Sequence, residues 1–163
     1  MSAFMRTFVD ASTIIALSKI GELELLRKLL GKIFITKSIE KELLCNEYPE
    51  TDIIRKAVGD WIVPVKVKGD TKKYVKYGLD KGEATLFLTG KKARLVIDEL
   101  NARRVADVEN REYTGLLGLI VAAVETKKLP KKKAKDIIDK LAESDFRMTV
   151  VLYKSVMERI KNA

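Results

Sequence analysis

Short apolar runs alternate with longer segments of helical periodicity along most of this chain. One run, Thr7-Phe8-Val9, is followed by Asp10, and a later run, Leu95-Val96-Ile97, is followed by Asp98. Strands that alternate with helices form parallel sheets covered on both faces, and such strands are apolar throughout. The alternation therefore predicts an α/β fold in which a mostly parallel central sheet lies between two layers of helices.

Apolar spacing and the positions of glycine and proline give approximate boundaries for these elements. Pro64 has no amide hydrogen to donate, so the run at 61–67 is expected at an edge of the sheet. Ser12 or Thr13 is expected to cap the first helix. Strands are expected at 7–9, 33–35, 61–67, 95–97 and about 112–113. Helices are expected at 14–19, 22–30, 36 or 38 to 44, 52–58, 83–91, 101–109, 114–128, 131–143 and 149–161.

Composition excludes several classes of active site. The 163 residues fit a single domain, 1–163, and contain one cysteine, Cys45, and no histidine. A lone cysteine excludes an intrachain disulfide, and the lack of histidine excludes imidazole-bound zinc and a Ser-His-Asp triad. Any chemistry must therefore use carboxylates, lysines, hydroxyls or a bound ion.

The charge balance bears on the partners of the protein. Lys and Arg number 32 against 23 Asp and Glu, a net charge of +9. Such an excess favours polyanions such as nucleic acid, although it also serves solubility. No apolar run approaches the ~20 residues of a membrane span, and residues 1–6 lack the layout of a signal peptide. We expect a cytoplasmic protein that does not associate with membranes.

Two carboxylates follow apolar strands at equivalent places, Asp10 and Asp98. Ligands of open parallel sheets bind beyond the carboxyl ends of the strands, so neighbouring strands would direct both side chains into one crevice. Either residue alone is as well explained as a helix cap. Glu83 is a third candidate, since it lies beside the apolar face of its helix near Phe87, although the helix dipole alone also favours an acid there.

The helix at 36–44 contributes a further acidic residue. Ile39, Leu43 and Leu44 define its buried stripe, and Glu40 lies nearer the centre of this stripe than Glu42, so periodicity alone favours Glu40. Clustered carboxylates repel one another unless a cation lies among them. Without histidine or clustered cysteine, the expected cation is Mg²⁺ or Mn²⁺, which suits hydrolysis of phosphodiesters.

Several motifs in order along the chain resemble the PIN-domain nucleases, and within them the VapC-like archaeal and bacterial proteins. The first carries a metal-binding Asp followed two residues later by a hydroxyl side chain, and the second has an acidic residue directly before leucine. The third has Gly-Glu where the broader family has Asp. The motifs are Val9–Leu17 (VDASTIIAL), Ser38–Leu44 (SIEKELL), Gly82–Leu88 (GEATLFL), Leu95–Ala106 (LVIDELNARRVA) and Tyr113–Gly118 (YTGLLG).

The resemblance implies a Rossmann-like three-layer α/β/α fold and assigns roles to residues. It places metal ligation and catalysis on Asp10, Glu42, Glu83 and Asp98, and so favours Glu42 over Glu40. Residues that would support these ligands or replace one of them are Ser12, Glu99 and Asn101. Arg103 and Arg104 follow the fourth motif and are candidates for holding RNA phosphates.

The function that the resemblance implies is a Mg²⁺- or Mn²⁺-dependent endoribonuclease, the toxin of a toxin–antitoxin pair, with an antitoxin partner and a homodimeric assembly. The departures at Glu83 and at Asp98-Glu99 leave open a weakly active or inactive PIN-like module that binds RNA or protein. A phosphatase of small nucleotides is a third hypothesis. Tyr74 and Tyr77 lie in a lysine-rich segment and could stack on unpaired bases, with packing expected for at least one of them.

Overall fold

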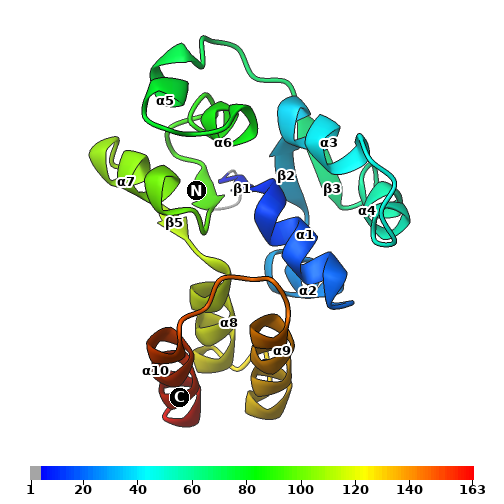
Figure 1. Ribbon diagram of the computed structural model, residues 1–163, viewed down its shortest axis with the longest axis vertical. Coiled ribbons are helices and arrows are strands. Elements are labelled where there is room, and N and C mark those ends of the chain that lie inside the picture. Colours follow the sequence, from blue (N-terminus) through cyan, green and yellow to red (C-terminus); the bar gives the residue numbers. More distant parts are fainter. Residues whose placement is uncertain (1–4) are drawn as a thin grey trace.

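The strands of residues 5–163, which are the residues that the structure describes, lie in one five-stranded parallel sheet of order β3-β2-β1-β4-β5. In this computed structural model, helices flank the sheet and produce three layers, α/β/α (Figure 1). The predicted fold class is therefore confirmed, with a sheet that is parallel throughout. The strands are β1 (Thr7–Val9), β2 (Ile33–Thr36), β3 (Ile62–Val65), β4 (Arg94–Val96) and β5 (Tyr113–Thr114).

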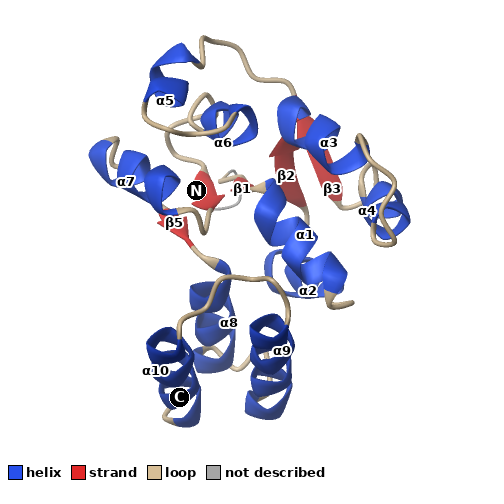
Figure 2. Cartoon of the chain, viewed as in Figure 1, coloured by secondary structure: helices blue, strands red, loops and turns tan. Residues whose placement is uncertain are grey.

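The helices fall into three groups (Figures 1 and 2). The first four gather on one side of the strands and the next three on the other, while the last three pack on one another below the sheet in this view. The first group is α1 (Ala11–Lys19), α2 (Glu24–Leu30), α3 (Lys37–Leu44) and α4 (Thr51–Ala57). The others are α5 (Lys72–Lys76), α6 (Lys81–Leu86), α7 (Leu100–Val108), α8 (Leu116–Glu125), α9 (Lys131–Glu143) and α10 (Val150–Lys161).

Strand order determines where a site can form. The chain passes outward from β1 to β2 and β3, and then returns to place β4 on the other side of β1. Val9 pairs with Val96, and the amide of Asp10 donates to the carbonyl of Val96 at 3.0 Å. The carboxyl ends of β1 and β4 therefore lie side by side where the order reverses, which is the position of the ligand crevice in open α/β sheets.

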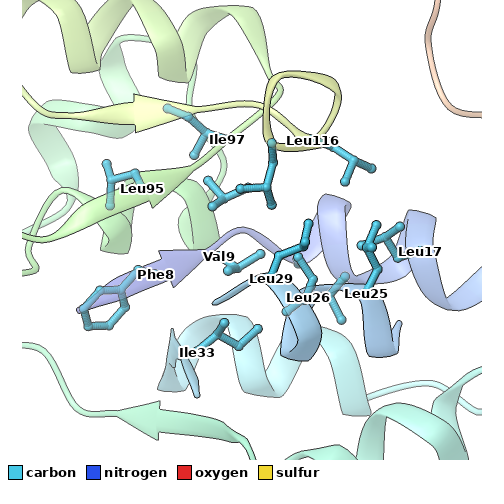
Figure 3. Close-up of a cluster of buried hydrophobic side chains, with 14 of the residues drawn as sticks. Phe8, Val9, Leu17, Leu25, Leu26, Leu29, Ile33, Leu95, Ile97 and Leu116 are labelled. Carbon is cyan, nitrogen blue, oxygen red and sulfur yellow. The ribbon is translucent and has the colours of Figure 1, made fainter. Parts of the chain in front are cut away.

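The strands are apolar because both faces of the sheet are covered. Val9, Ile33, Leu95 and Ile97 have no exposed surface and join a single cluster of buried side chains that includes Leu116 at the start of α8 (Figure 3). Each buried side chain of this kind contributes roughly 1.5–3 kcal/mol. β3 is an edge strand, as Pro64 predicts, since an edge tolerates the missing amide hydrogen.

Several predicted helix boundaries are wrong, and α5 was not predicted. α8 spans Leu116–Glu125 rather than 114–128. α1 begins at Ala11, and its N-cap is Asp10 rather than Ser12 or Thr13. α6 ends at Leu86 instead of continuing to about residue 91. The amides of the three residues that follow Leu86 bond to carbonyls three residues back, which is the tighter pattern that often closes a helix.

Among the described residues, no helix is both long and apolar enough to cross a membrane. Residues 1–4, on which the expectation of a missing signal peptide partly rests, lie outside the described part of the chain.

The C-terminal helices are tied to the rest of the fold by two ion pairs that share the half-buried Glu22, as well as by apolar packing. Glu22 lies just before α2, and its Oε2 accepts from Lys133 at 2.8 Å and from Lys140 at 3.1 Å, both on α9. Burial alone would raise the pKa of Glu22, but the bonds from the two lysines outweigh it and lower the pKa below its ordinary value. The pair thus favours the ionised carboxylate and fixes α9 against the α1–α2 turn.

We expect Glu22→Gln to lower the free energy of unfolding by about 1 kcal/mol, because it removes two linked ion pairs that are partly shielded from solvent. Urea denaturation at low and high salt measures the change, and the difference should shrink as salt screens the pairs. Glu24→Gln is the matched control, since the Glu24 side chain is exposed and lies 3.9 Å from Arg27. Equal losses in both variants would contradict a special role for Glu22.

Candidate functional site

Asp10 is a buried carboxylate at the end of β1. Only 4% of the residue is exposed, and Ser12 Oγ donates a hydrogen bond to its Oδ2 at 3.0 Å. Burial raises the pKa of Asp10 to about 7, against the opposing effect of the Ser12 hydrogen bond, and the charges of Asp80 and Glu42 raise it further. A group in this environment takes up a proton or a cation readily near neutral pH.

Glu42 extends from α3 toward the start of α6. A Cβ placed on Gly82 would lie 2.8 Å from Glu42 Oε1, so the glycine makes room for this carboxylate. Burial of the carboxyl group and the charge of Asp80 raise the pKa of Glu42. Glu40, in contrast, lies 3.5 Å from the ammonium of Lys37. The charge of Glu42 also raises the pKa of Asp10, so Glu42 lies near Asp10, whereas periodicity had favoured Glu40.

Glu83 and Asp80 hold each other at the start of α6. The amide of Glu83 donates to Asp80 Oδ1 at 2.8 Å, and the amide of Asp80 donates to Glu83 Oε1 at 2.9 Å, which is a reciprocal capping box. Glu83 is 7% exposed, and burial raises its pKa to about 7, with smaller contributions from the charges of Asp10, Asp80 and Glu99. Asp80 is a residue that the sequence analysis missed, although the spacing Asp-x-x-Glu before a helix is the signature of a capping box.

These side chains form what we call the acidic cluster: Asp10, Glu42, Asp80, Glu83 and Glu99. They come from four separate segments, yet the charge of one raises the pKa of another. Within residues 5–163, none of these carboxylates lies within 4.0 Å of a lysine or arginine nitrogen. The cluster thus carries negative charge that no basic side chain of the described part compensates.

Asp98 is placed differently from the acidic cluster. It accepts from Thr13 Oγ1 and from the amide of Leu116, both at 3.0 Å, and from the guanidinium of Arg103 at 3.4 Å. A Cβ on Gly115 would overlap the Arg103 guanidinium and lie 2.6 Å from Asp98 Oδ1, so this glycine makes room for the Asp98–Arg103 pair. Asp98 therefore connects α1, α7 and α8 beside the crevice, and its charge is met by donors of the chain itself.

The remaining candidates lie on α7. Glu99 is the N-cap, and its Oε2 accepts from the amide of Ala102 at 2.9 Å. Asn101 approaches the turn at Gly78, where a Cβ would be 3.0 Å from Asn101 Nδ2.

The two arginines predicted to bind RNA phosphates differ in their surroundings. Arg103 donates to the carbonyl of Ile97 at 3.1 Å and lies over the ring of Tyr113, 5.9 Å from its centroid. Together with its bond to Asp98, these contacts engage Arg103 within the fold, whereas Arg104 is exposed on the surface.

The side chains of the acidic cluster are of the type that binds hard divalent cations. All of its side chains offer carboxylate oxygens, which Mg²⁺ and Mn²⁺ prefer. A cation would offset the cost of ionising Asp10, Glu42 and Glu83, whose pKa values are raised by burial and by mutual repulsion. In the described residues, however, no three acidic or cysteine side chains converge closely enough to hold an ion. The chemistry of the cluster fits a metal, and its side chains would have to adjust to close around one.

We expect the protein in chelator to lose stability as the pH rises. The pKa values of Asp10 and Glu83 are about 7 in the folded chain, whereas unfolded carboxyls ionise near pH 4. The folded state therefore binds more protons between about pH 4 and pH 7, and the free energy of unfolding falls across this interval. Urea denaturation at about pH 5 and about pH 8 should show a loss of a few kcal/mol.

Asp10→Asn removes one of the ionising groups and should reduce this dependence on pH. Glu40→Gln is the matched control, because Glu40 pairs with Lys37 outside the acidic cluster. An Asp10→Asn variant whose stability varies with pH as strongly as that of the unmutated chain would contradict the raised pKa of Asp10.

Comparison with known proteins identifies the family. The family model DUF3368, described as a PIN domain, matches residues 6–162. The search of curated proteins and the search of solved structures gave no match to this chain. PIN domains are generally nucleases, which agrees with an acidic site in a basic protein. Because the match covers almost the whole chain and the structure has the expected three layers, this protein belongs to the PIN-domain family.

Proposed function

We propose that this protein is a Mg²⁺- or Mn²⁺-dependent endoribonuclease that hydrolyses phosphodiester bonds of RNA at the acidic cluster. The observation that carries the proposal is that carboxylates from four segments, none paired with a basic side chain in residues 5–163, raise one another's pKa near the carboxyl ends of β1 and β4. A net charge of +9 on the whole chain supports a polyanionic substrate. The negative cluster by itself would repel the phosphate of that substrate. A cation in the cluster reconciles the two charges.

In this proposal Asp10, Glu42 and Glu83 hold the ion, and Asp98 is the fourth ligand assigned by the resemblance. The bound ion supplies neutralisation of the reacting phosphate and activation of the attacking water. Ser12 fixes the orientation of Asp10 through its hydrogen bond at 3.0 Å. Asp80 orients Glu83, because the capping box engages Glu83 Oε1 and leaves the second carboxylate oxygen for another partner.

The finer biological role rests on the resemblance of the motifs to VapC-like proteins. We propose that the single domain 1–163 acts in the cytoplasm as the toxin of a toxin–antitoxin pair. An antitoxin protein would be its partner, and two copies would form a homodimer. Arg104 is exposed and remains a candidate for contact with RNA phosphates, whereas Arg103 would first have to leave its contacts with Asp98 and Tyr113.

A second function is favoured by one observation: in the described residues, no three acids converge to hold an ion. A PIN-like module that binds RNA or protein without cutting needs no metal site. Calorimetric titration with Mn²⁺ separates the two functions, because the nuclease requires a saturable metal site and the binding module does not.

The unmutated protein should cleave RNA in the presence of Mn²⁺ or Mg²⁺, and Asp10→Asn should lower the rate by more than about 100-fold. This exceeds the 10- to 100-fold effects typical of residues that only support a ligand, as expected for Ser12→Ala. Gel analysis of a labelled RNA with and without chelator measures both rates. Equal cleavage by the unmutated protein and by Asp10→Asn would reject the assignment.

Gly82→Ala should weaken Mn²⁺ binding by about tenfold or more, as changes around metal ligands commonly do. Its Cβ would lie 2.8 Å from Glu42 Oε1 and so displace that carboxylate. Alanine favours a helix over glycine by up to about 1 kcal/mol, so the fold should survive.

Gly90→Ala is the matched control for this substitution, because a Cβ on Gly90 meets nothing within 4 Å. Calorimetry of the two variants compares the affinities. Unchanged affinity in Gly82→Ala would show that Glu42 does not hold the ion.

A further inference from the structure

Two buried threonine hydroxyls face each other between α3 and α6, the helices that carry Glu42 and Glu83. Thr36 ends β2 and is the N-cap of α3, and Thr85 lies in α6. The exposed fractions of the two threonines are 0% and 7%, and their Oγ1 atoms are 2.7 Å apart. The contact joins two helices that are separated in the sequence but lie next to each other in the fold (Figure 1).

This contact is the middle bond of a chain of three hydrogen bonds. The amide of Ile39 donates to Thr36 Oγ1 at 3.2 Å. Thr85 Oγ1 donates to the carbonyl of Gly82 at 2.6 Å. A hydroxyl has one proton, so all three contacts are made only if Thr36 donates to Thr85. Each hydroxyl then donates once and accepts once, which satisfies both groups in the interior.

Both ends of this chain of bonds lie beside carboxylates of the proposed metal site. Ile39 lies three residues before Glu42 on α3. Gly82 directly precedes Glu83 on α6. A Cβ on Gly82 would lie 2.8 Å from Glu42 Oε1 and 3.4 Å from Ile39 Cγ1, so the two helices meet at this glycine. The separation of α3 and α6 at the threonines therefore determines how far apart the two glutamates begin.

A hydrogen bond holds the helices closer together than apolar packing would. The two hydroxyl oxygens lie 2.7 Å apart, whereas heavy atoms in van der Waals contact lie about 3.5–4.0 Å apart. Valine has the shape of threonine, with a methyl group in place of the hydroxyl. A methyl group in place of the Thr85 hydroxyl would therefore separate α3 and α6 by on the order of 1 Å more.

The separation of Glu42 and Glu83 matters because divalent cations differ in the geometry that they accept. Mg²⁺ requires near-ideal octahedral geometry with ligand distances of about 2.0–2.1 Å. Ca²⁺ accepts a larger number of oxygens at about 2.3–2.6 Å in flexible arrangements. A site whose ligands come from two helices held at a fixed, short separation thus favours the smaller and more demanding ion.

We propose that Thr36 and Thr85 are positioning residues whose hydroxyl pair holds Glu42 and Glu83 at the separation that selects Mg²⁺ over Ca²⁺. This inference rests on the proposed nuclease function, since it assumes that both glutamates hold the ion. The threonines act through the positions of α3 and α6 rather than through contact with the ion.

Calorimetric titration of the full chain with Mg²⁺ and with Ca²⁺ tests the proposal. Thr85→Val should weaken Mg²⁺ binding about tenfold, the scale of effect expected when a residue that orients metal ligands is changed. Ca²⁺ affinity should change less, so the ratio of Mg²⁺ affinity to Ca²⁺ affinity should fall. Thr85→Ser keeps the hydroxyl and should keep the ratio of the unmutated chain. Thr36→Val removes the other hydroxyl and provides a second test should Thr85→Val fail to fold.

Thr51→Val is the matched control for a loss of stability alone. Thr51 lies in α4 and is 1% exposed. Its hydroxyl accepts from the amide of Tyr48 at 2.9 Å and donates to the carbonyl of Asn46 at 3.0 Å. Urea denaturation in chelator should show that Thr51→Val and Thr85→Val both lower the free energy of unfolding, because each removes a buried hydroxyl that donates and accepts. Only Thr85→Val should change the affinity ratio.

The outcomes distinguish this inference from the proposed function. If the unmutated chain binds Mg²⁺ and Thr85→Val keeps the affinity ratio, the positioning role is wrong and the proposed nuclease stands. An equal fall of the ratio in Thr51→Val also overturns the inference, because the effect would then follow from lost stability. An unmutated chain that prefers Ca²⁺ overturns the selectivity, and one that binds neither ion overturns the proposed function together with this inference.

Discussion

Repulsion between carboxylates at the reversal point of the sheet is the constraint around which the local structure is organised. β1 delivers Asp10 into a buried position, α3 brings Glu42, and the start of α6 adds Asp80 and Glu83. Burial and mutual charge raise the pKa of Asp10, Glu42 and Glu83, and no basic side chain among residues 5–163 pairs with them. Such an arrangement costs stability when the groups are ionised, and the proposed cation would remove that cost.

Two glycines permit this arrangement, and neither is required for an unusual backbone conformation. Gly82 and Gly115 both lack a positive φ, but a Cβ on Gly82 would press on Glu42 Oε1, and one on Gly115 would press on the paired Arg103 and Asp98 side chains. The Gly-Glu and Thr-Gly pairs that resemble the family motifs thus have a steric explanation. One glycine admits an acid from a neighbouring helix, and the other admits the acid that follows β4.

Features that depend on local sequence were predictable, and those that depend on packing between elements were not. The apolar run ending in Asp10, the parallel sheet and the edge position of Pro64 follow from patterns within a few residues. Periodicity does not decide between Glu40 and Glu42, because a helical wheel measures position relative to the helix's own buried stripe. The resemblance to the family motif favoured Glu42, which in the structure lies against Gly82 at the start of α6. Asp80 was visible as a capping box, but its charge becomes relevant only where α6 meets β1 and α3.

The carboxylates at the crevice are of two kinds, the compensated Asp98 and the uncompensated acidic cluster. Asp98 is met by the hydroxyl of Thr13, the amide of Leu116 and the guanidinium of Arg103, so its charge is compensated inside the protein and it fixes three helices relative to β4. The acidic cluster lacks such compensation and is therefore the part of the site that can respond to a cation. Loss of activity on changing Asp98 would reflect helix positions as much as metal binding, whereas changes at Asp10 or Glu42 act on the uncompensated charge itself. The proposed metal binding is therefore best tested at Asp10 and Glu42.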